Sequence, residues 1–464
     1  MGRIARRWGA AGGYREFLGI ALPLILSTAS WSIQHFVDRV FLSWYSTEAL
    51  AAALPAGMAN FTFISLFMGT AQYANTFVAQ YMGARRPTRV GPAVWQGAHV
   101  ALFSGLLALL PAAFAGELFA FIGHDPGIRA AETQYFRILC YGTGPQVLST
   151  AFSCFFSGRG QTWVVLAVNV VAISVNIICD YALIFGHWGL PELGIVGAAW
   201  ATNIGLVVSA LCFAVLFLGP RYRGEYATLR GWKPDLKLLL RLLRFGGPNG
   251  VNFMLDIMAF TFFLFIVGRL GPIPLAATNL AFHINSLAFM PLIGCSIAVS
   301  TMVGQRLGRD QPEVAEYCTW SGLHLAMLYM GTMSAGYVLV PEFFLAPFGE
   351  EQDANFAVAH QIAVVLLRFV ALYCVFDAAY MVFAAALKGA GDTRFVMWIS
   401  ILLAWAIMVV PSFAALTYFD RGLYLIWIFC CAYICVLGVA LYLRFRTGRW
   451  KSMRVIERAD EDSE

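Results

Sequence analysis

The sequence predicts an all-α integral membrane protein with twelve transmembrane helices, arranged as two six-helix bundles related by pseudo-twofold symmetry along the membrane normal. Three observations predict this class: the composition, a series of long apolar blocks, and an internal repeat. Of the 464 residues, 60% are hydrophobic and only 12% are charged, whereas a soluble globular chain has roughly 25% charged residues. The composition therefore excludes a water-soluble protein.

The apolar residues fall into blocks that are long enough to cross a bilayer as helices. A helix needs ~20 apolar residues to span the ~30 Å hydrocarbon layer. These blocks are unbroken, unlike the ~10-residue alternating strands of a membrane barrel, so the α-helix is the spanning structure that satisfies the backbone. The twelve blocks lie near residues 16–45, 49–80, 92–122, 133–156, 162–187, 194–219, 238–268, 274–304, 314–344, 357–387, 395–418 and 422–445.

The basic residues predict the orientation. Of the 31 Lys and Arg residues, 25 fall in the termini and in the loops of one side, and loops rich in Lys and Arg stay in the cytoplasm. We therefore expect both termini in the cytoplasm and the chain in the cell (inner) membrane. The expected domains are an N-lobe at 1–219 (spans 1–6), a cytoplasmic linker with the start of span 7 at 220–244, a C-lobe at 238–446 (spans 7–12) and a cytoplasmic tail at 447–464.

The two halves of the chain resemble each other. TFVAQYMGARRP at 76–87 and TMVGQRLGRDQP at 301–312 align at an offset of 225, which also matches Pro23 with Pro248 and Gly69 with Gly294. A later match, SGRGQT at 157–162 with KGAGDT at 388–393, has an offset of 231. Each half holds an even number of spans, so both have the same orientation, and transporters commonly bind substrate between two such repeats.

Four aspartates lie inside the apolar blocks, where an ionisable side chain is costly and therefore a candidate for function. They are Asp38, Asp180, Asp256 and Asp377. A helical rise of ~1.5 Å per residue from the nearest cytoplasmic basic residue places the first two at ~32–35 Å, in the outer part of the membrane, and the other two at ~17–18 Å, near its midplane. At the repeat offsets none has an acidic counterpart, which disfavours a role in the shared scaffold.

Each aspartate follows a polar residue by four positions and shares a helix face with it. The pairs are Gln34 with Asp38, Asn176 with Asp180, Asn252 with Asp256, and Tyr373 with Asp377; Thr202 in the sixth span reaches a similar outer depth, and Asn285 adds a further polar group in the eighth span. A buried carboxylate with amide or hydroxyl neighbours can bind Na⁺ or take up and release a proton. Gln34, Asn252 and Asn285 are expected as polar groups of a substrate cavity.

The motifs resemble one known family. Val37-Asp38, AQYMGA (79–84), SGRGQT, NIICDYALIFG (176–186), GAAWAT (197–202), VGQRLG (303–308) and LKGAGDT (387–393) are similar, in the correct order along nearly the whole chain, to the multidrug and toxic compound extrusion (MATE) transporters of the bacterial type. The resemblance implies a twelve-helix antiporter that exports organic cations and other amphipathic compounds in exchange for H⁺ or Na⁺.

The resemblance also implies site residues. The N-lobe cation network would be Asp38, Asn176, Asp180 and Thr202, and the C-lobe cation site Tyr373, Asp377 and Asp256. Asp256 stands where the family pattern has Glu, which leaves the ligand geometry and the ion open. Arg39, directly after Asp38, can pair with that acid or extend to the outer surface.

Other functions are less compatible with the sequence. A flippase for a lipid-linked precursor from the same superfamily is the main alternative, although such a protein would be expected to have more basic residues within its spans. An enzyme is not expected, because neither H-E-x-x-H nor G-x-S-x-G occurs. No cysteine or histidine spacing suits a metal, no cofactor is expected beyond the coupling ion, and the loop placement of basic residues argues against nucleic acid. The expected partners are small amphipathic or cationic substrates and the lipid bilayer, with a monomer sufficient for function.

Overall fold

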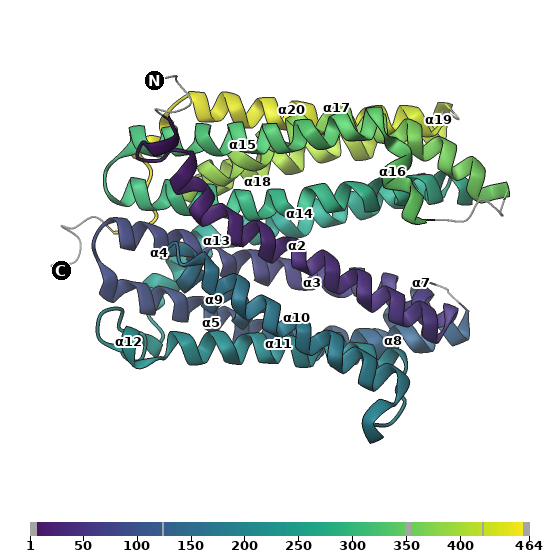
Figure 1. Ribbon diagram of the computed structural model, residues 1–464, viewed down its shortest axis with the longest axis horizontal. Helices are drawn as coiled ribbons and strands as arrows, with labels where there is room; N and C mark the ends of the chain where they lie inside the picture. Colours follow the sequence, from purple (N-terminus) through teal and green to yellow (C-terminus); the bar gives the residue numbers. More distant parts are fainter. Residues whose placement is uncertain (1–6, 123–124, 349–353, 420–421, 458–464) are drawn as a thin grey trace. The chain divides into compact units, whose positions relative to one another are not determined.

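The computed structural model describes residues 7–122, 125–348, 354–419 and 422–457. Throughout these residues the regular secondary structure is helical, with no β-strand (Figure 1). The all-α class is therefore confirmed.

Ten helical segments of the described chain are long and apolar enough to cross a membrane. They correspond to ten of the twelve predicted blocks. The other two blocks are also helical: 133–156 falls on α8 (Pro126–Tyr141) and α9 (Thr143–Gly158), and 314–344 falls mainly on α15 (Pro312–Leu339). The break at Gly142 leaves α8 and α9 with 16 residues each, and at a rise of ~1.5 Å per residue only the two together reach across the bilayer.

The chain forms two compact units, which are described separately. Unit 1 comprises residues 1–25, 255–307 and 311–454, and unit 2 comprises 26–254, 308–310 and 455–464. Two long helices are each divided between the units. The first part of α2 (Tyr14–Tyr45) belongs to unit 1 and its remainder to unit 2, whereas the first part of α13 (Leu236–Gly268) belongs to unit 2 and its remainder to unit 1.

Unit 2 is built around helices that pack pairwise: α10 on α11, α5 on α9, α3 on α8, and α11 on α9. Unit 2 contains α8, α9 and parts of α2 and α13. It also contains α3 (Thr47–Gln72), α4 (Ala74–Gly83), α5 (Val90–Leu107), α6 (Leu109–Ala113), α7 (Ala115–Ile122), α10 (Thr162–Phe185), α11 (Ile195–Phe217) and α12 (Pro220–Arg223). In α3 the side chain of Ser46 caps the first turn by accepting hydrogen bonds from two backbone N–H groups.

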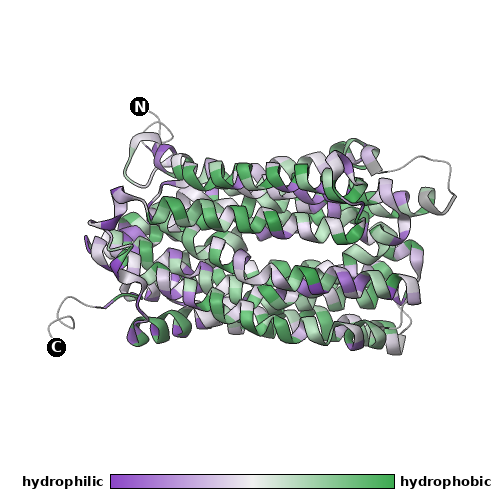
Figure 2. Cartoon of the chain, turned by 90° about the horizontal axis from the view of Figure 1, so that it is seen from below, coloured by the Kyte–Doolittle hydropathy of each residue, from purple (hydrophilic) through white to green (hydrophobic). Residues whose placement is uncertain are grey.

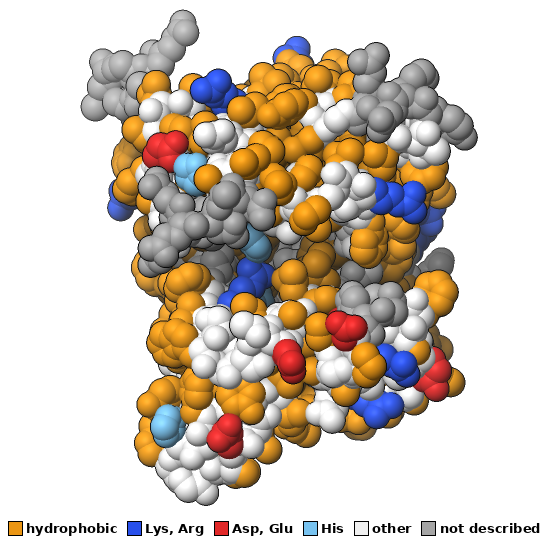
Figure 3. Space-filling model, turned by 90° about the vertical axis from the view of Figure 1, so that its right-hand side faces the viewer, with side chains coloured by type: hydrophobic (Ala, Val, Ile, Leu, Met, Phe, Trp, Pro, Cys, Tyr) orange, Lys and Arg blue, Asp and Glu red, His pale blue; other side chains and the backbone are white. Residues whose placement is uncertain are grey.

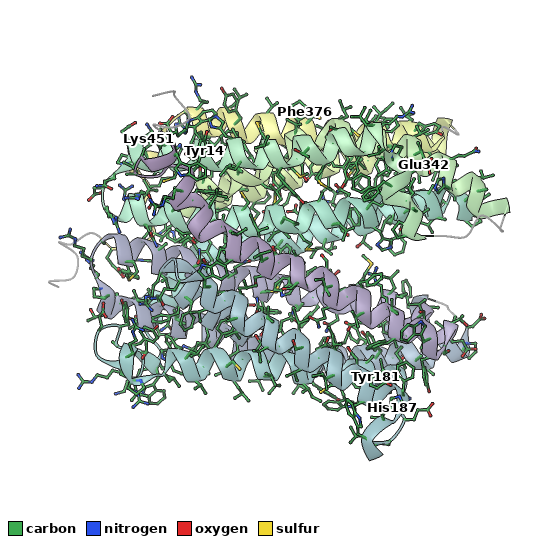
Figure 4. The ribbon with its side chains drawn as sticks, in the orientation of Figure 1. Tyr14, Tyr181, His187, Glu342, Phe376 and Lys451 are labelled. Atoms are coloured by element: carbon green, nitrogen blue, oxygen red, sulfur yellow. The ribbon has the colours of Figure 1, made fainter. Side chains whose placement is uncertain are left out.

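Unit 1 is built around α17 (Ala354–Ala390), which packs against α15 and α20 (Leu423–Arg446). Its other helices are α14 (Pro272–Gly308), α16 (Pro341–Leu345), α18 (Thr393–Leu403) and α19 (Val410–Phe419), with a π-helical segment at Ala404–Val409 between the last two. Figure 4 shows Tyr14 and Lys451 at one end of this unit and Glu342 at the other.

Glycines at equivalent positions of the repeat carry the same packing role. A Cβ on Gly69 of α3 would lie 2.9 Å from the Cα of Gly250 on α13, and a Cβ on Gly294 of α14 would lie 2.6 Å from the backbone N of Ile25 on α2. Because Gly69 and Gly294 are 225 residues apart, each half uses the same glycine to bring its second span against the first span of the other half. Small residues allow such close approach of membrane helices.

Large hydrophobic side chains are exposed along the helices. Leu106, Leu211, Leu328 and Trp398 are among them, and hydrophobic residues run along most of the helix lengths in Figure 2. The end of the molecule in Figure 3 also has many hydrophobic side chains, with charged ones scattered singly. Exposed apolar surface on this scale is typical of a protein solvated by lipid.

The basic linker is held against unit 2. Trp95 Nε1 donates to the carbonyl of Thr228 at 2.6 Å, and the guanidinium of Arg159 lies 4.1 Å from the ring centre of Tyr226 and 4.7 Å from that of Tyr222. Arg159 Nη2 also donates to Tyr226 Oη at 3.1 Å. Burial raises the pKa of the Tyr226 phenol above its usual value, so this hydroxyl stays protonated. The linker residues Tyr222, Tyr226 and Thr228 are thereby packed against α5 and α9.

Candidate cation sites

The first candidate site lies in unit 2, where α2, α10 and α11 supply the polar groups. Asp38 is on α2, Asn176 and Asp180 are on α10, and Thr202 is on α11. Asn176 and Asp180 are almost completely buried, at 1% and 0% exposure. The four-residue spacing places them one helical turn apart on one face. Two helices therefore bring two acids and an amide together.

The helix packing also directs Thr202 toward α10. A Cβ on Gly205 would lie 3.0 Å from the Cβ of Asn176, so this part of α11 packs closely on α10. Thr202 precedes Gly205 by three residues and lies on the same side of the helix. Its hydroxyl donates to the carbonyl of Ala198 at 3.0 Å, which leaves an oxygen lone pair for a cation.

The two acids of this site interact with each other. The Asp38 and Asp180 carboxyl groups lie close enough to interact directly, and Asn176 interacts with Asp180. Within the described chain, Oδ1 of Asp38, both carboxyl oxygens of Asp180 and both polar atoms of the Asn176 amide are buried without a hydrogen-bond partner from the protein. We call Asp38 and Asp180 the N-lobe acid pair. Asn176 is the amide beside this pair. Oxygens gathered in this way are ligands suited to a proton or Na⁺.

Two neighbours modify the charge at this site. Arg39 is exposed and interacts electrostatically with Asp38. Tyr135 of α8 interacts with Asp38, Asp180 and Arg39. Sequence analysis missed Tyr135 because it lies on another helix, and no helical spacing connects it with the acids.

The second candidate site lies in unit 1, on α13, α17 and α20. Asp377 and Tyr373, one turn apart on α17, are 6% and 2% exposed. Asp256 of α13 accepts a hydrogen bond from Tyr380 Oη at 3.4 Å. Tyr380 and Tyr433, on α17 and α20, each interact electrostatically with both Asp256 and Asp377. Tyr380 therefore contacts Asp256, and both tyrosines lie near the two acids, which we call the C-lobe acid cluster.

A basic residue belongs to the same cluster. Lys388, near the end of α17, interacts electrostatically with Asp256. Lys388 is one of the 25 basic residues that predict the cytoplasmic side, and its position in the sequence did not indicate an interaction with Asp256. Tyr380 and Tyr433 were missed as well, although Tyr380 follows Asp377 by three residues and this spacing could have indicated it.

The three polar residues expected in a substrate cavity are divided between the two units. Gln34 and Asn252 lie in the parts of α2 and α13 that belong to unit 2, whereas Asn285 lies on α14 in unit 1. Asn285 Oδ1 accepts a weak contact from Cys374 Sγ at 4.0 Å, next to Tyr373. Asn252 is fully buried, and the unit boundary falls between it and Asp256. Asn252 and Asp256 are therefore one helical turn apart on α13 but belong to different compact units.

The fold and these buried acids define a multi-pass membrane transporter built from two homologous halves. The family model MatE matches residues 23–182 and 248–413. The chain therefore belongs to the MatE family, and like its relatives it is a transporter and no enzyme. The two matched segments are displaced by 225 residues at their starts and 231 at their ends, the offsets of the internal repeat.

Curated relatives and solved structures agree with this assignment. The chain is 29% identical over 453 residues to a probable multidrug resistance protein NorM of Brucella suis, covering 95% of this chain and 94% of that protein. The Thermotoga maritima protein of the same name is 25% identical, with 96% and 94% covered. A MOP superfamily transporter from Pyrococcus furiosus has a TM-score of 0.84 at 21% identity, covering 98% of this chain and 100% of that chain. A eukaryotic MATE transporter, AtDTX14, has a TM-score of 0.84 at 17% identity, with 94% and 96% covered. The two solved structures show the fold.

Proposed function

We propose that this protein is a secondary antiporter of a bacterial inner membrane that exports organic cations and drugs in exchange for H⁺ or Na⁺ by alternating access. The observation that carries the proposal is the N-lobe acid pair, in which two carboxyl groups interact directly and several buried oxygens lack a partner from the protein. The relatives named as probable multidrug resistance proteins support the substrate class. With the basic loops inside, both termini are cytoplasmic.

The acid pair can couple an ion because two neighbouring buried carboxylates repel each other. Both can be ionised at low cost only when a cation lies between them, and otherwise one must hold a proton. The coupling cation is thus required by the site itself. The ligands for it are Asp38, Asn176 and Asp180, with the lone pair of Thr202 on the adjacent helix.

The C-lobe acid cluster contributes a second negative charge. Lys388 acts as a fixed counter-ion for Asp256, which leaves Asp377, beside Tyr373, as the acid that takes up a cation. The shorter Asp256, where the family pattern has Glu, is compatible with this pairing because the long lysine side chain can reach it. A cationic drug competes for the same negative charge, so ion entry favours drug release.

Exchange follows when the ion and the drug prefer different states of the transporter. Each ligand can shift the equilibrium only by its difference in affinity for the two states, and the coupling is reciprocal. Both acid sites lie within one chain, so a monomer suffices. No step needs a cofactor other than the ion.

The test is efflux of a fluorescent organic cation from membrane vesicles under an imposed Na⁺ or pH gradient. One gradient should drive efflux in the wild type, and Asp180→Asn should abolish it. The matched control is Asp235→Asn in the linker: Asp235 Oδ1 accepts the N–H of Leu238 at the start of α13 at 3.1 Å, and Asn caps a helix equally well.

The same efflux experiment also tests the alternative function, a flippase for a lipid-linked precursor. A fold alone does not establish a substrate, and the Pyrococcus furiosus structure is described as having a binding pocket of reverse polarity that suggests a different function. If neither gradient drives efflux of an organic cation in the wild type, the antiporter proposal fails. The flippase for a lipid-linked precursor then becomes the function to test.

A further inference from the structure

The segment between the two halves of the chain carries its excess positive charge. Residues 220–244 contain seven basic and two acidic side chains, a net charge of +5 that equals the net charge of the whole chain. This segment connects α11, which ends at Phe217, with α13, which begins at Leu236. Both helices are long and apolar enough to cross a membrane. The short connection between them therefore lies at a membrane surface.

Contacts within unit 2 fix one side of this segment. The Tyr226 carbonyl accepts a hydrogen bond from the Gly91 N–H at 3.0 Å. A Cβ on Gly231 would lie 2.8 Å from Pro92 Cδ, so the backbone of the segment lies directly on the start of α5. Tyr226, Thr228 and Gly231 are accordingly buried. Figure 1 shows α12, where the segment begins, at the opposite end of unit 2 from α7.

The other side of the segment presents apolar and basic side chains in adjacent pairs. Leu229, Trp232 and Leu236 are 50%, 57% and 69% exposed. A basic residue directly follows each of them, and all three basic residues are exposed. We call this surface the linker face; it consists of Leu229, Arg230, Trp232, Lys233, Leu236 and Lys237.

The acidic residue within this stretch is held by other contacts of unit 2. Asp235 Oδ1 accepts the N–H of Leu238 at the start of α13, and Oδ2 lies 3.8 Å from Arg89 Nη1. Arg89 therefore compensates the carboxylate of Asp235. The three basic side chains give the linker face its positive charge.

We propose that the linker face binds the headgroups of anionic phospholipids at the membrane surface. Phosphate oxygens accept charge-assisted hydrogen bonds from guanidinium and ammonium groups, and basic segments next to a membrane span are attracted to anionic lipids. The Trp232 ring suits the boundary between headgroups and acyl chains, where tryptophan is enriched in membrane proteins. Three features select this occupant: the positive charge, the direct continuation into α13, and a backbone already fixed on α5. The inference goes beyond the proposed antiport and requires neither the coupling ion nor the exported compound.

Quenching of Trp232 by brominated lipids tests the proposal in the full-length protein. Vesicles contain phosphatidylcholine and phosphatidylglycerol in a fixed ratio, and the bromine is carried by one lipid or by the other. Because the chain has 13 tryptophans, the Trp232 signal is taken as the difference between the wild type and Trp232→Phe. Brominated phosphatidylglycerol should quench this signal with an association constant about tenfold above that of brominated phosphatidylcholine.

A charge-matched pair of variants shows whether the linker face is responsible. Arg230→Gln, Lys233→Gln and Lys237→Gln together should abolish the preference, since each charge contributes about fivefold to the association constant. The control combines Arg309→Gln, Arg446→Gln and Arg449→Gln. These exposed residues of other basic regions remove the same charge, and the preference should persist. The same loss in both triple variants would refute a site on the linker face.

The wild type alone provides a second test if the triple variant does not fold. At about 1 M NaCl the Debye length shrinks to ~3 Å, so the preference for phosphatidylglycerol should disappear while Trp232 is still quenched. Equal quenching by the two lipids at low salt would refute anionic recognition. Absence of quenching by either lipid would place the linker face in water and also refute the proposal.

Efflux measured in the same vesicles separates this proposal from the proposed function. If a gradient drives efflux and Trp232 shows no lipid preference, the lipid site is wrong and the antiporter proposal stands. If the lipid preference is present and neither gradient drives efflux of an organic cation, the antiporter proposal is wrong and the lipid site stands.

Discussion

The two acid sites of this transporter differ in how their negative charges are compensated. In unit 2, Asp38 and Asp180 interact directly, and the protein offers no hydrogen-bond partner to either oxygen of Asp180. In unit 1, Asp256 accepts a hydrogen bond from Tyr380 and interacts electrostatically with Lys388. Arg39 likewise interacts electrostatically with Asp38, so the difference between the two sites rests on Asp180, at which we propose that the coupling cation binds.

This difference exists within a repeated scaffold. Gly69 and Gly294 serve the same close packing in the two halves, yet none of the four acids has an acidic counterpart. The halves thus share what fixes the helices and differ in what binds ions. We infer that the acid pair of unit 2 is the main coupling site and that Asp377 of unit 1 is also needed for export.

The largest effect is expected for Asp180→Asn. The substitution removes the mutual repulsion that makes a cation necessary, so coupling should be lost and the initial efflux rate should fall by up to about 150-fold. Vesicle efflux under the driving gradient measures this. A rate within twofold of the wild type would eliminate the acid pair as the coupling site.

Asp377→Asn is expected to abolish most export, with a fall of about 50-fold, while the protein still folds. The neutral amide keeps the size of the side chain but cannot attract a cation. Drug resistance of cells that express the variant, together with its thermal unfolding, distinguishes loss of transport from loss of folding. Unchanged resistance would remove Asp377 from the coupling scheme.

Lys388→Met should have a smaller effect that concerns the ion. Without the fixed ammonium group, Asp256 becomes available to an external cation, and the ion concentration for half-maximal efflux should fall about tenfold, which corresponds to ~1.4 kcal/mol. Lys388→Arg, which keeps the charge, is the control. If the methionine and arginine variants have the same ion dependence, Lys388 does not compensate Asp256.

The smallest effect is expected for Thr202→Val. The valine keeps the shape but removes a single neutral oxygen ligand, so the apparent ion affinity should weaken about threefold to fivefold. Thr202→Ser should retain the wild-type affinity. An unchanged affinity in the valine variant would show that the cation is held without Thr202.

The sequence was sufficient to predict the fold class and the family. Long apolar blocks have few alternatives in a bilayer, because only helices satisfy their backbone there. The constant offsets of the repeat, confirmed by the two segments of the family match, reflect a scaffold that must keep its register. The acids could be identified because a charge in an apolar block is conspicuous.

The partners of these acids could be predicted only where they lie on the same helix. Asn176 and Tyr373 were found through the four-residue spacing, but Tyr135 and Tyr433 are on other helices, and their approach depends on packing. Lys388 was interpreted only as a marker of the cytoplasmic side, because a lysine near a helix end is usually solvated. The division of α2 and α13 between the units could not be predicted, because hydrophobic periodicity does not indicate which neighbour a helix face contacts.

The central claim is that the acid pair in unit 2 holds the coupling cation that the drug displaces. The most direct measurement is ion release from the purified protein on addition of tetraphenylphosphonium, recorded as protons in weak buffer and as ²²Na⁺ in parallel. The account predicts release of one of the two ions from the wild type and none from Asp180→Asn. Release that is the same in both proteins would contradict it.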